Sequence, residues 1–254
     1  MRMRFKPYAR PELLATPWHA HEPAANKGCW RSQFARPEQP MHLELGCGKG
    51  GFLARLAAAH PEVNYLGIDI TDKVLILAKR KIEALYAETG RPVDNVLIMS
   101  LNIERILDAF SRQDAVQRIY INFCNPWNRK LAHKKHRLTH TRQLALYRQL
   151  LAGGGEVYFK TDDDGLFADS LEYFAEAGFA VVWKTLDLHQ NEPAWNIRTE
   201  HEAMFTDQGI ATKALIAQKL PLAREAETLA AAIAARTAKE KAESAAIRAA
   251  RGEA

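Results

Sequence analysis

Short apolar runs alternate along this chain with longer segments in which apolar residues recur at helical spacing. The short runs predict strands, and the periodic segments predict helices that bury one face. The predicted strands are His42–Leu45, Asn64–Asp69, Asn95–Ser100, Arg118–Phe123, Glu156–Lys160 and Ala180–Leu186. The predicted helices lie near Gly51–Ala59, Asp72–Glu88, Ile103–Phe110, Thr139–Leu151 and Leu166–Ala177. This order is typical of an α/β protein whose mostly parallel sheet carries helices on both faces.

Polar residues stand at or just after the ends of the predicted strands. They are Glu44, Asp69, Asn102, Asn125 and Asp162. Ligands of open parallel sheets bind at the carboxyl ends of the strands. We therefore expect these five side chains to converge on one site.

The first predicted strand runs directly into a glycine-rich turn. Residues 43–51 read Leu-Glu-Leu-Gly-Cys-Gly-Lys-Gly-Gly, and a predicted helix follows. Glycines such as Gly46 and Gly48 let the backbone approach a ligand closely, and the free N–H groups of a helix N-terminus favour electron-rich groups. Asp69 ends the next predicted strand, where its two acceptor oxygens suit ribose hydroxyls. The unit predicts a site for a nucleotide-like cofactor.

The glycine spacing fits two classes of cofactor. The segment from Gly46 to Gly51 matches G-x-G-x-x-G, which allows a nicotinamide-dependent oxidoreductase, and it also contains G-x-G-x-G. S-adenosylmethionine has no pyrophosphate and carries a cationic methionine part. Glu44, just before the turn, can hold that cation and would repel a pyrophosphate. The carboxylate therefore favours the methyl donor over the nicotinamide cofactor.

Composition narrows the class of protein. The 254 residues can bury a substantial core, and the net charge of +5 admits a polyanionic partner. Cys29, Cys47 and Cys124 form no C-x-x-C pair, so we expect no disulfide framework and no metal site. We also expect no membrane segment and a cytoplasmic location, because no apolar run is long enough for a span or a signal core.

The two ends differ from the middle in composition. Residues 1–40 hold prolines and basic residues and predict a basic arm or cap, and residues 41–220 form the predicted main domain. Residues 221–254 are rich in alanine and predict a helical or partly disordered extension. A solvated appendage is the favoured interpretation of this extension. The alternative is an RNA contact through Arg236, Lys239, Lys241, Arg248 and Arg251.

A second polar segment follows the strand predicted to end at Phe123. It reads Asn-Pro-Trp over residues 125–127, and a basic stretch from Arg129 to Arg137 comes next. The proline fixes a turn, the tryptophan can stack on a base, and the cations suit phosphate. The hypothesis is that Arg129, Lys130, Lys134, Lys135 and Arg137 line the path of an RNA substrate.

Several motifs in order carry a resemblance to a known family. They are Arg4–Ala9, Lys27–Trp30, the glycine loop, Gly67–Asp69, Asn95–Asn102, the Asn-Pro-Trp loop, Phe159–Asp162, Leu186–His189 and Asn196–Glu202. From Met1 to about Leu220 the chain resembles the bacterial tRNA guanine-N7 methyltransferases, which modify guanine-46. The resemblance implies a Rossmann-like class I methyltransferase with a mostly parallel seven-stranded sheet. It also implies S-adenosylmethionine as cofactor, tRNA as partner, and a monomer or homodimer.

The resemblance also implies roles for individual residues. Matching positions place Glu44, Asp69, Asn102 and Asn125 around the cofactor, beside Gly46 and Gly48 of the loop. Positions that hold the target guanine or its surroundings in the family are occupied here by Arg129, Asp162, Thr199 and Glu202.

Asn125 is the main departure from the family, which usually has at this position the aspartate commonly described as catalytic. Smaller departures occur at Asp69, Asn102, Arg129 and His201. Guanine N7 already carries a lone pair, so methyl transfer needs alignment more than a base. We therefore expect Asn125 to orient guanine in an active enzyme. The alternative is a catalytically weak or silent tRNA-binding protein on the same scaffold.

Overall fold

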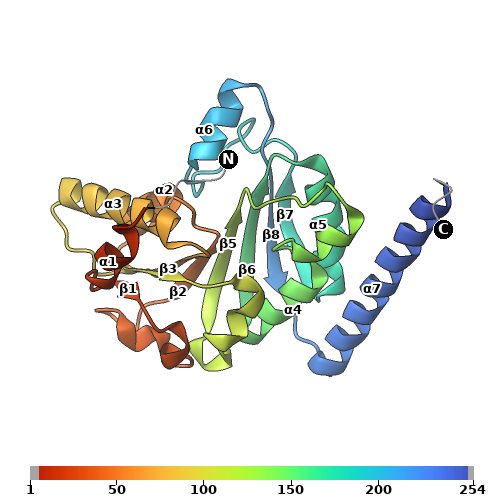
Figure 1. Ribbon diagram of the computed structural model, residues 1–254, viewed down its shortest axis with the longest axis horizontal. Coiled ribbons are helices and arrows are strands. Elements are labelled where there is room, and N and C mark those ends of the chain that lie inside the picture. The colour runs from red at the N-terminus through yellow and green to blue at the C-terminus, as the bar shows by residue number, and fades with distance from the viewer. Residues whose placement is uncertain (1–5, 251–254) are drawn as a thin grey trace.

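The computed structural model describes residues 6–250 and shows one central sheet with helices on both faces (Figure 1). Within that range the sheet has eight strands in the order β1-β4-β3-β2-β5-β6-β8-β7. The strands are β1 (His19–Ala20), β2 (Met41–Leu45), β3 (Asn64–Asp69), β4 (Val96–Ser100), β5 (Val116–Asn122), β6 (Leu151–Thr161), β7 (Phe179–Thr185) and β8 (Lys213–Lys219). Only β8, among these, runs antiparallel to its neighbours, β6 and β7.

Two apolar cores lie on the two faces of the sheet. One face buries side chains of α1 (Ala9–Leu14), α2 (Gly51–Ala59) and α3 (Asp72–Thr89). The other face buries side chains of α4 (Thr141–Leu150), α5 (Asp164–Glu176) and the 3-10 helix η3 (Ile103–Asp108). Further short 3-10 helices are η1 (Pro23–Asn26), η2 (Trp30–Gln33), η4 (Arg112–Asp114) and η5 (Leu131–His136). The helix α6 (Glu200–Asp207) stands above the carboxyl ends of the parallel strands.

The predicted α/β class and all six strands read from the apolar runs are confirmed. The expected count of seven strands is wrong by one, because the two-residue β1 adds an edge strand beside β4. The pattern analysis also did not find β8, whose sequence Lys-Ala-Leu-Ile-Ala-Gln-Lys consists largely of good helix formers. The helix expected over Ile103–Phe110 is the 3-10 helix η3.

The segment before β2 packs against the sheet. Trp30 is fully buried, stacks on Phe110 with ring centroids 5.3 Å apart, and donates from Nε1 to the carbonyl oxygen of Ala109 over 2.8 Å. Asp114 accepts hydrogen bonds from the backbone N–H groups of Gly28 and Trp30. Trp30 and Phe34 thereby anchor this segment in the core that α4 and α5 cover.

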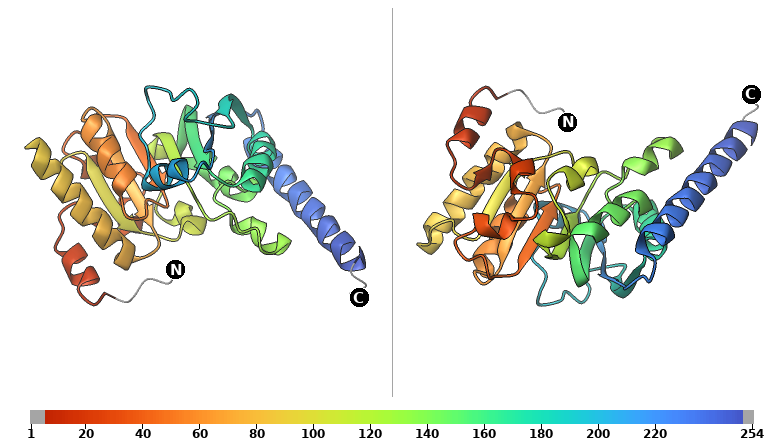
Figure 2. Two further views of the ribbon diagram at one scale, coloured as in Figure 1. Left: turned by 90° about the horizontal axis from the view of Figure 1, so that it is seen from above. Right: turned by 90° about the horizontal axis from the view of Figure 1, so that it is seen from below.

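The alanine-rich extension forms the long helix α7 (Glu225–Ala250), which runs along the outside of the domain (Figure 2). Its first half is docked. Arg236 is 5% exposed and pairs with Glu172 and Glu176 of α5, and Leu229 is buried. The interpretation as a solvated appendage is therefore wrong for this half.

The docking of α7 also limits its proposed RNA contact. Arg236 and Lys239 already pair with α5 carboxylates, whereas Lys241 and Arg248 are exposed. Arg251 lies outside the described residues. Across residues 6–250, no helix combines the length and the apolar character needed to cross a membrane.

Candidate active site

The glycine loop joins β2 to α2 and brings backbone N–H groups to the carboxyl edge of the sheet. Gly46, Gly48 and Gly50 all have positive φ, a conformation that side chains disfavour. At Gly50 a side chain is also excluded by packing, because an added Cβ would lie 2.6 Å from the Cβ of Ala78 on α3. The loop geometry therefore depends on glycine both for its turn and for the close contact of α2 with α3.

Asp69, at the end of β3, fixes this loop. Its Oδ2 accepts from the N–H of Gly48 over 3.0 Å, and its Oδ1 accepts from the N–H of Thr71 over 3.3 Å. Burial raises the pKa of Asp69, and the backbone hydrogen bonds oppose that shift. The carboxylate is partly exposed, so it retains lone pairs for a ligand beside the loop.

Glu44 and Asn122 form a buried polar pair at the ends of the adjacent strands β2 and β5. The Nδ2 of Asn122 donates to Oε1 of Glu44 over 3.2 Å. Two acceptor atoms, Oε2 of Glu44 and Oδ1 of Asn122, are buried and have no hydrogen-bond partner among the described residues. Burial raises the pKa of Glu44 to about 7. Both the orphaned acceptors and the raised pKa call for a ligand that is cationic and donates hydrogen bonds.

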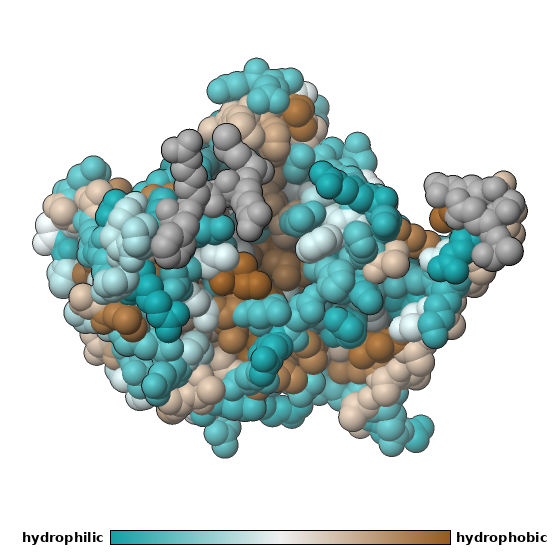
Figure 3. Space-filling model, viewed as in Figure 1, coloured by the Kyte–Doolittle hydropathy of each residue, from teal (hydrophilic) through white to brown (hydrophobic). Residues whose placement is uncertain are grey.

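Two cavities meet at this edge and share Gly46, Asn122 and Phe123. The first, about 270 Å³, is walled by the glycine loop on one side and by Thr199, Glu200 and His201 of the α6 region on the other. The second, about 500 Å³, is lined by residues including Asp69, Asn102 and Asn125. Figure 3 shows the centre of the viewed face hollowed below α6, with apolar side chains exposed there. Together the cavities are lined by all six predicted cofactor residues, which are Glu44, Gly46, Gly48, Asp69, Asn102 and Asn125.

Asn102 and Asn125 use their side-chain oxygens in local turns. Oδ1 of Asn102 accepts from the N–H of Glu104 over 3.0 Å, and Oδ1 of Asn125 accepts from the N–H of Trp127 over 3.0 Å. Each exposed asparagine therefore retains its NH₂ group and one oxygen lone pair for a ligand. The loop of Asn125 is bent sharply, with positive φ at Phe123 and Trp127.

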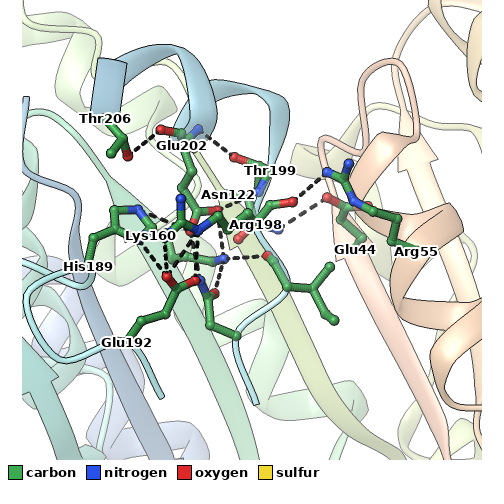
Figure 4. A network of polar contacts seen from close by, with 12 residues as sticks. Glu44, Arg55, Asn122, Lys160, His189, Glu192, Arg198, Thr199, Glu202 and Thr206 are labelled. Atoms are coloured by element: carbon green, nitrogen blue, oxygen red, sulfur yellow. Dashed lines mark hydrogen bonds and ion pairs between the residues drawn. The ribbon is translucent and has the colours of Figure 1, made fainter. Parts of the chain in front are cut away.

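Glu202 is fully buried at the first turn of α6 (Figure 4). Its Oε2 accepts from Nζ of Lys160 over 2.9 Å and from the N–H of Thr199 over 2.7 Å. Its Oε1 accepts from Nδ2 of Asn196 over 3.1 Å. Thr199 completes a capping box by accepting from the N–H of Glu202. In this arrangement the carboxylate of Glu202 anchors α6, and Thr199 lines the first cavity.

Of the four predicted substrate residues, Thr199 lines the first cavity, whereas Arg129, Asp162 and Glu202 line neither cavity. Arg129 is exposed, and Asp162 follows β6, where its carbonyl oxygen accepts from Nζ of Lys213 over 2.9 Å. Within residues 6–250 no hydrogen bond to the Asp162 carboxylate is present, so that group is available to a ligand.

The basic stretch after the Asn-Pro-Trp loop divides into two kinds of cation. Arg137 is 2% exposed, donates to the carbonyl oxygen of Pro126 and pairs with Asp169 of α5. Lys134 also pairs with Asp169, at 2.7 Å. Arg129, Lys130 and Lys135 are exposed. The structure thus assigns Lys134 and Arg137 to holding η5 in place and leaves the other three cations exposed to solvent.

The sequence predicted no role in the site for Asn122, Phe123 or Lys160. Asn122 pairs with Glu44, and Phe123 stacks on His201 with ring centroids 5.5 Å apart, between the two cavities. Their place at the end of β5 was a usable signal. No signal in the sequence predicted the pairing of Lys160 with Glu202, 42 residues later, because this contact depends on the tertiary fold.

Among the described residues, no group of three or more His, Cys, Asp or Glu side chains is placed to hold a metal ion. The groups that line the two joined cavities include carboxylates, amides and the backbone of the glycine loop.

The chain resembles known proteins in its sequence and in its fold. Residues 38–215 match a family model described as a putative methyltransferase. The tRNA (guanine-N(7)-)-methyltransferase of Clostridium perfringens strain 13 is 53% identical, covering 87% of this chain and all of that protein. The protein of the same name from Acetivibrio thermocellus is 47% identical over 86% of this chain.

A solved structure shares the fold. It is a 16S rRNA (adenine(1408)-N(1))-methyltransferase mutant from Catenulisporales acidiphilia with its cosubstrate SAM. The TM-score is 0.50 at 15% identity, and the match covers 79% of this chain and 92% of that one.

Proposed function

The chain belongs to the tRNA (guanine-N(7)-)-methyltransferase family, and from this premise we propose that it transfers a methyl group from S-adenosylmethionine to N7 of guanine-46 in tRNA. The names of the relatives support tRNA as the substrate and N7 of guanine as the methylated atom. The choice of position 46 follows the resemblance of the motifs from Arg4 to Glu202.

The observation that carries the proposal is the pair of orphaned acceptors on Glu44 and Asn122. The methionine part of the donor has an ammonium group with three N–H bonds and a positive charge. Such a group satisfies Oε2 of Glu44 and Oδ1 of Asn122 together, and it stabilises the ionised form of a carboxyl whose pKa burial has raised. The residues present therefore fit the methionine part of S-adenosylmethionine in the first cavity.

The second cavity suits the adenosine part. Asp69 lines it and retains acceptor capacity for ribose hydroxyls. Asn102 can bind an adenine edge through its NH₂ group, since its oxygen accepts from the turn N–H of Glu104. The backbone of Gly46 is shared by both cavities, as expected for a ligand that bridges them.

The target guanine is expected beside Asn125, Asp162 and Thr199. The available carboxylate of Asp162 is suited to the N1–H and N2–H donors of guanine. Glu202 acts through Thr199 and α6, because its own oxygens are engaged by Lys160 and the backbone. Asn125 contributes neutral hydrogen bonds at the junction of cofactor and base.

When bound, the cofactor supplies an electrophilic methyl group on a sulfonium sulfur. The protein's part is to align guanine N7 with that methyl group, since N7 attacks with its own lone pair and no proton must first be removed. The methylated base is cationic, so carboxylates near it stabilise the developing charge. Asp162 fits this second role.

Incubation of the full chain with labelled S-adenosylmethionine and unmodified tRNA, followed by nucleoside mapping, tests the proposal. We expect 7-methylguanosine at position 46. The matched control is the same tRNA with adenine at that position, which should take up no label. Label at another guanine would contradict the choice of position, and no label in any tRNA would contradict the activity.

A further inference from the structure

A cluster of cations lies on the rim of the first cavity, on the side of α2 and α3. Lys81 of α3 forms an ion pair with Glu200 of α6, and Nη2 of Arg55 of α2 donates to the carbonyl oxygen of Arg198. Lys49 belongs to the glycine loop and lines the same cavity. Burial, and then the positive charges of Lys49 and Arg55, lower the pKa of Lys81. Lys49 and Arg55 therefore each repel the ammonium of Lys81.

Glu200 places a carboxylate beside Lys81 at this rim. A Cβ added to Gly51, the first residue of α2, would lie 2.9 Å from Oε1 of Glu200. The carboxylate thus sits against the first turn of α2, where the helix favours an anion, and beside the ammonium of Lys81. It neutralises one of three positive charges. The remaining charge leaves the rim suited to a stronger anion.

The cluster is open to solvent. The side chains of Lys81 and Glu200 are 38% and 46% exposed, and Lys49 and Arg55 are exposed. Glu44, by contrast, is only 3% exposed. An anion that reaches the cluster therefore comes from the molecular surface, whereas the buried carboxyl receives the cationic end of a small molecule.

We propose that Lys49, Arg55 and Lys81 bind a backbone phosphate of the tRNA, and that Glu200 occupies the place of that phosphate in the free protein. The inference rests on the proposed function, since it takes tRNA as the substrate. Phosphate oxygens accept charge-assisted hydrogen bonds from both lysine and arginine. The exposed cations near η5 lie by the second cavity, which His136 also lines, so the tRNA would be held on both sides of the opening.

Two substitutions that should change the affinity for tRNA in opposite directions test the proposal. Lys81→Gln should weaken the binding of unmodified tRNA by about 3- to 10-fold and lower the salt dependence of binding, because one fewer counterion is released. Glu200→Gln should strengthen tRNA binding by about 2- to 5-fold, because it removes the competing carboxylate. Lys81→Arg keeps the charge and should bind tRNA like the parent protein.

Matched controls are Lys184→Gln on β7 and Glu88→Gln near the end of α3, both exposed positions away from the cluster. Binding is measured by fluorescence anisotropy at several salt concentrations, with thermal unfolding as the check on folding. The affinity for S-adenosylhomocysteine is measured in parallel and should stay unchanged in Lys81→Gln, because Lys81 lines neither cavity.

Two results would overturn the proposal while the parent protein still methylates tRNA. One is tRNA binding in the Lys81→Gln and Glu200→Gln variants that matches the controls or changes in the same direction. The other is a change in S-adenosylhomocysteine affinity alone, which would assign the cluster to the carboxylate of the donor. A parent protein that neither binds nor methylates tRNA would instead remove the proposed function, and this inference with it.

Discussion

Glu44 and Asn122 share one hydrogen bond, and each keeps one buried acceptor that has no partner within residues 6–250, at the ends of neighbouring parallel strands. A buried acceptor without a donor is costly, so the pair is incomplete in the free protein. The cavity beside it is the one walled by the glycine loop and α6.

Methyl-donor affinity should depend on pH through Glu44. Burial raises the pKa of Glu44 to about 7, so the carboxyl is neutral below that pH and ionised above it. Affinity for S-adenosylhomocysteine, which retains the ammonium group, should therefore rise between about pH 5.5 and pH 7.5, and binding should release a proton. Calorimetry in two buffers of different ionisation enthalpy measures both. Glu44→Gln should bind more weakly and without this pH dependence.

The same shift predicts how the free protein responds to pH. The native carboxyl has the raised pKa, so its burial lowers the free energy of unfolding as the pH rises from near 4.5 to about 7. In urea unfolding, the Glu44→Gln variant should not show this decrease in the free energy of unfolding. An identical pH profile in both proteins would contradict the assignment of the shift to Glu44.

Asp69→Ala should sharply weaken cofactor binding. It removes two charged acceptors, each worth roughly 1.5–3 kcal/mol, and also frees the N–H groups of Gly48 and Thr71 from the carboxylate. Asp69→Glu keeps the charge and should bind the donor more tightly than Asp69→Ala does. Calorimetric titration is the measurement. An unchanged dissociation constant in folded Asp69→Ala would count against the ribose assignment.

Substitution of the cations around η5 should have two different effects. Some substitutions should weaken tRNA binding, and others should destabilise the fold. Replacing Arg129, Lys130 and Lys135 together by alanine should weaken tRNA binding and flatten its salt dependence, with no change in melting temperature. Arg137→Ala should instead destabilise the fold by about 2–4 kcal/mol, because it leaves Asp169 and the carbonyl of Pro126 without their buried partner. Filter binding and thermal unfolding separate the two effects. The prediction is wrong if the triple variant binds tRNA like the parent protein.

The ion pair between Lys160 and Glu202 should behave as a buried pair. Lys160→Met alone leaves the fully buried Glu202 carboxylate without its cation and should cost about 3–5 kcal/mol in the free energy of unfolding. Adding Glu202→Gln should recover part of this loss, since glutamine can still cap α6. Chemical unfolding of the two single variants and the double variant measures the coupling. Additive losses would show that the pair is not coupled.

Asn125 should orient guanine without acting as a base. Asn125→Asp should preserve or raise activity, because a carboxylate accepts more hydrogen bonds and neutralises the cationic product. Asn125→Ala should lower the rate by about 10- to 100-fold through looser alignment. Asp162→Ala should do at least as much damage. The measurement is single-turnover methylation of one unmodified tRNA at saturating enzyme and cofactor.

An inactive parent protein that gains activity with Asn125→Asp would instead favour the silent tRNA-binding alternative. Full activity in both alanine variants would mean that the base pocket lies elsewhere.

The cofactor half of the site was predictable because its chemistry is local. The glycine loop follows its strand directly, and Asp69 ends the next strand, so periodicity placed both at one edge of the sheet. The half near α6 was not predictable from pattern. Its anchor joins β6 to a short helix through Lys160 and Glu202, and β8, which passes beside β6, has the composition of a helix. Such contacts are specified only when distant segments meet.

Because β8 comes late in the sequence, its position determines the order in which parts of the sheet can fold during synthesis. Within residues 6–250, β7 pairs with β8 alone, and β8 is made after it, so β7 has no partner strand in that range until residues 213–219 have followed. The segment that carries α6 lies between these two strands and is tied to the sheet at both ends only then. A growing chain can therefore complete the half-sheet of β2, β3 and β4 early, whereas the wall formed by Thr199, Glu200 and His201 must be among the last parts to settle.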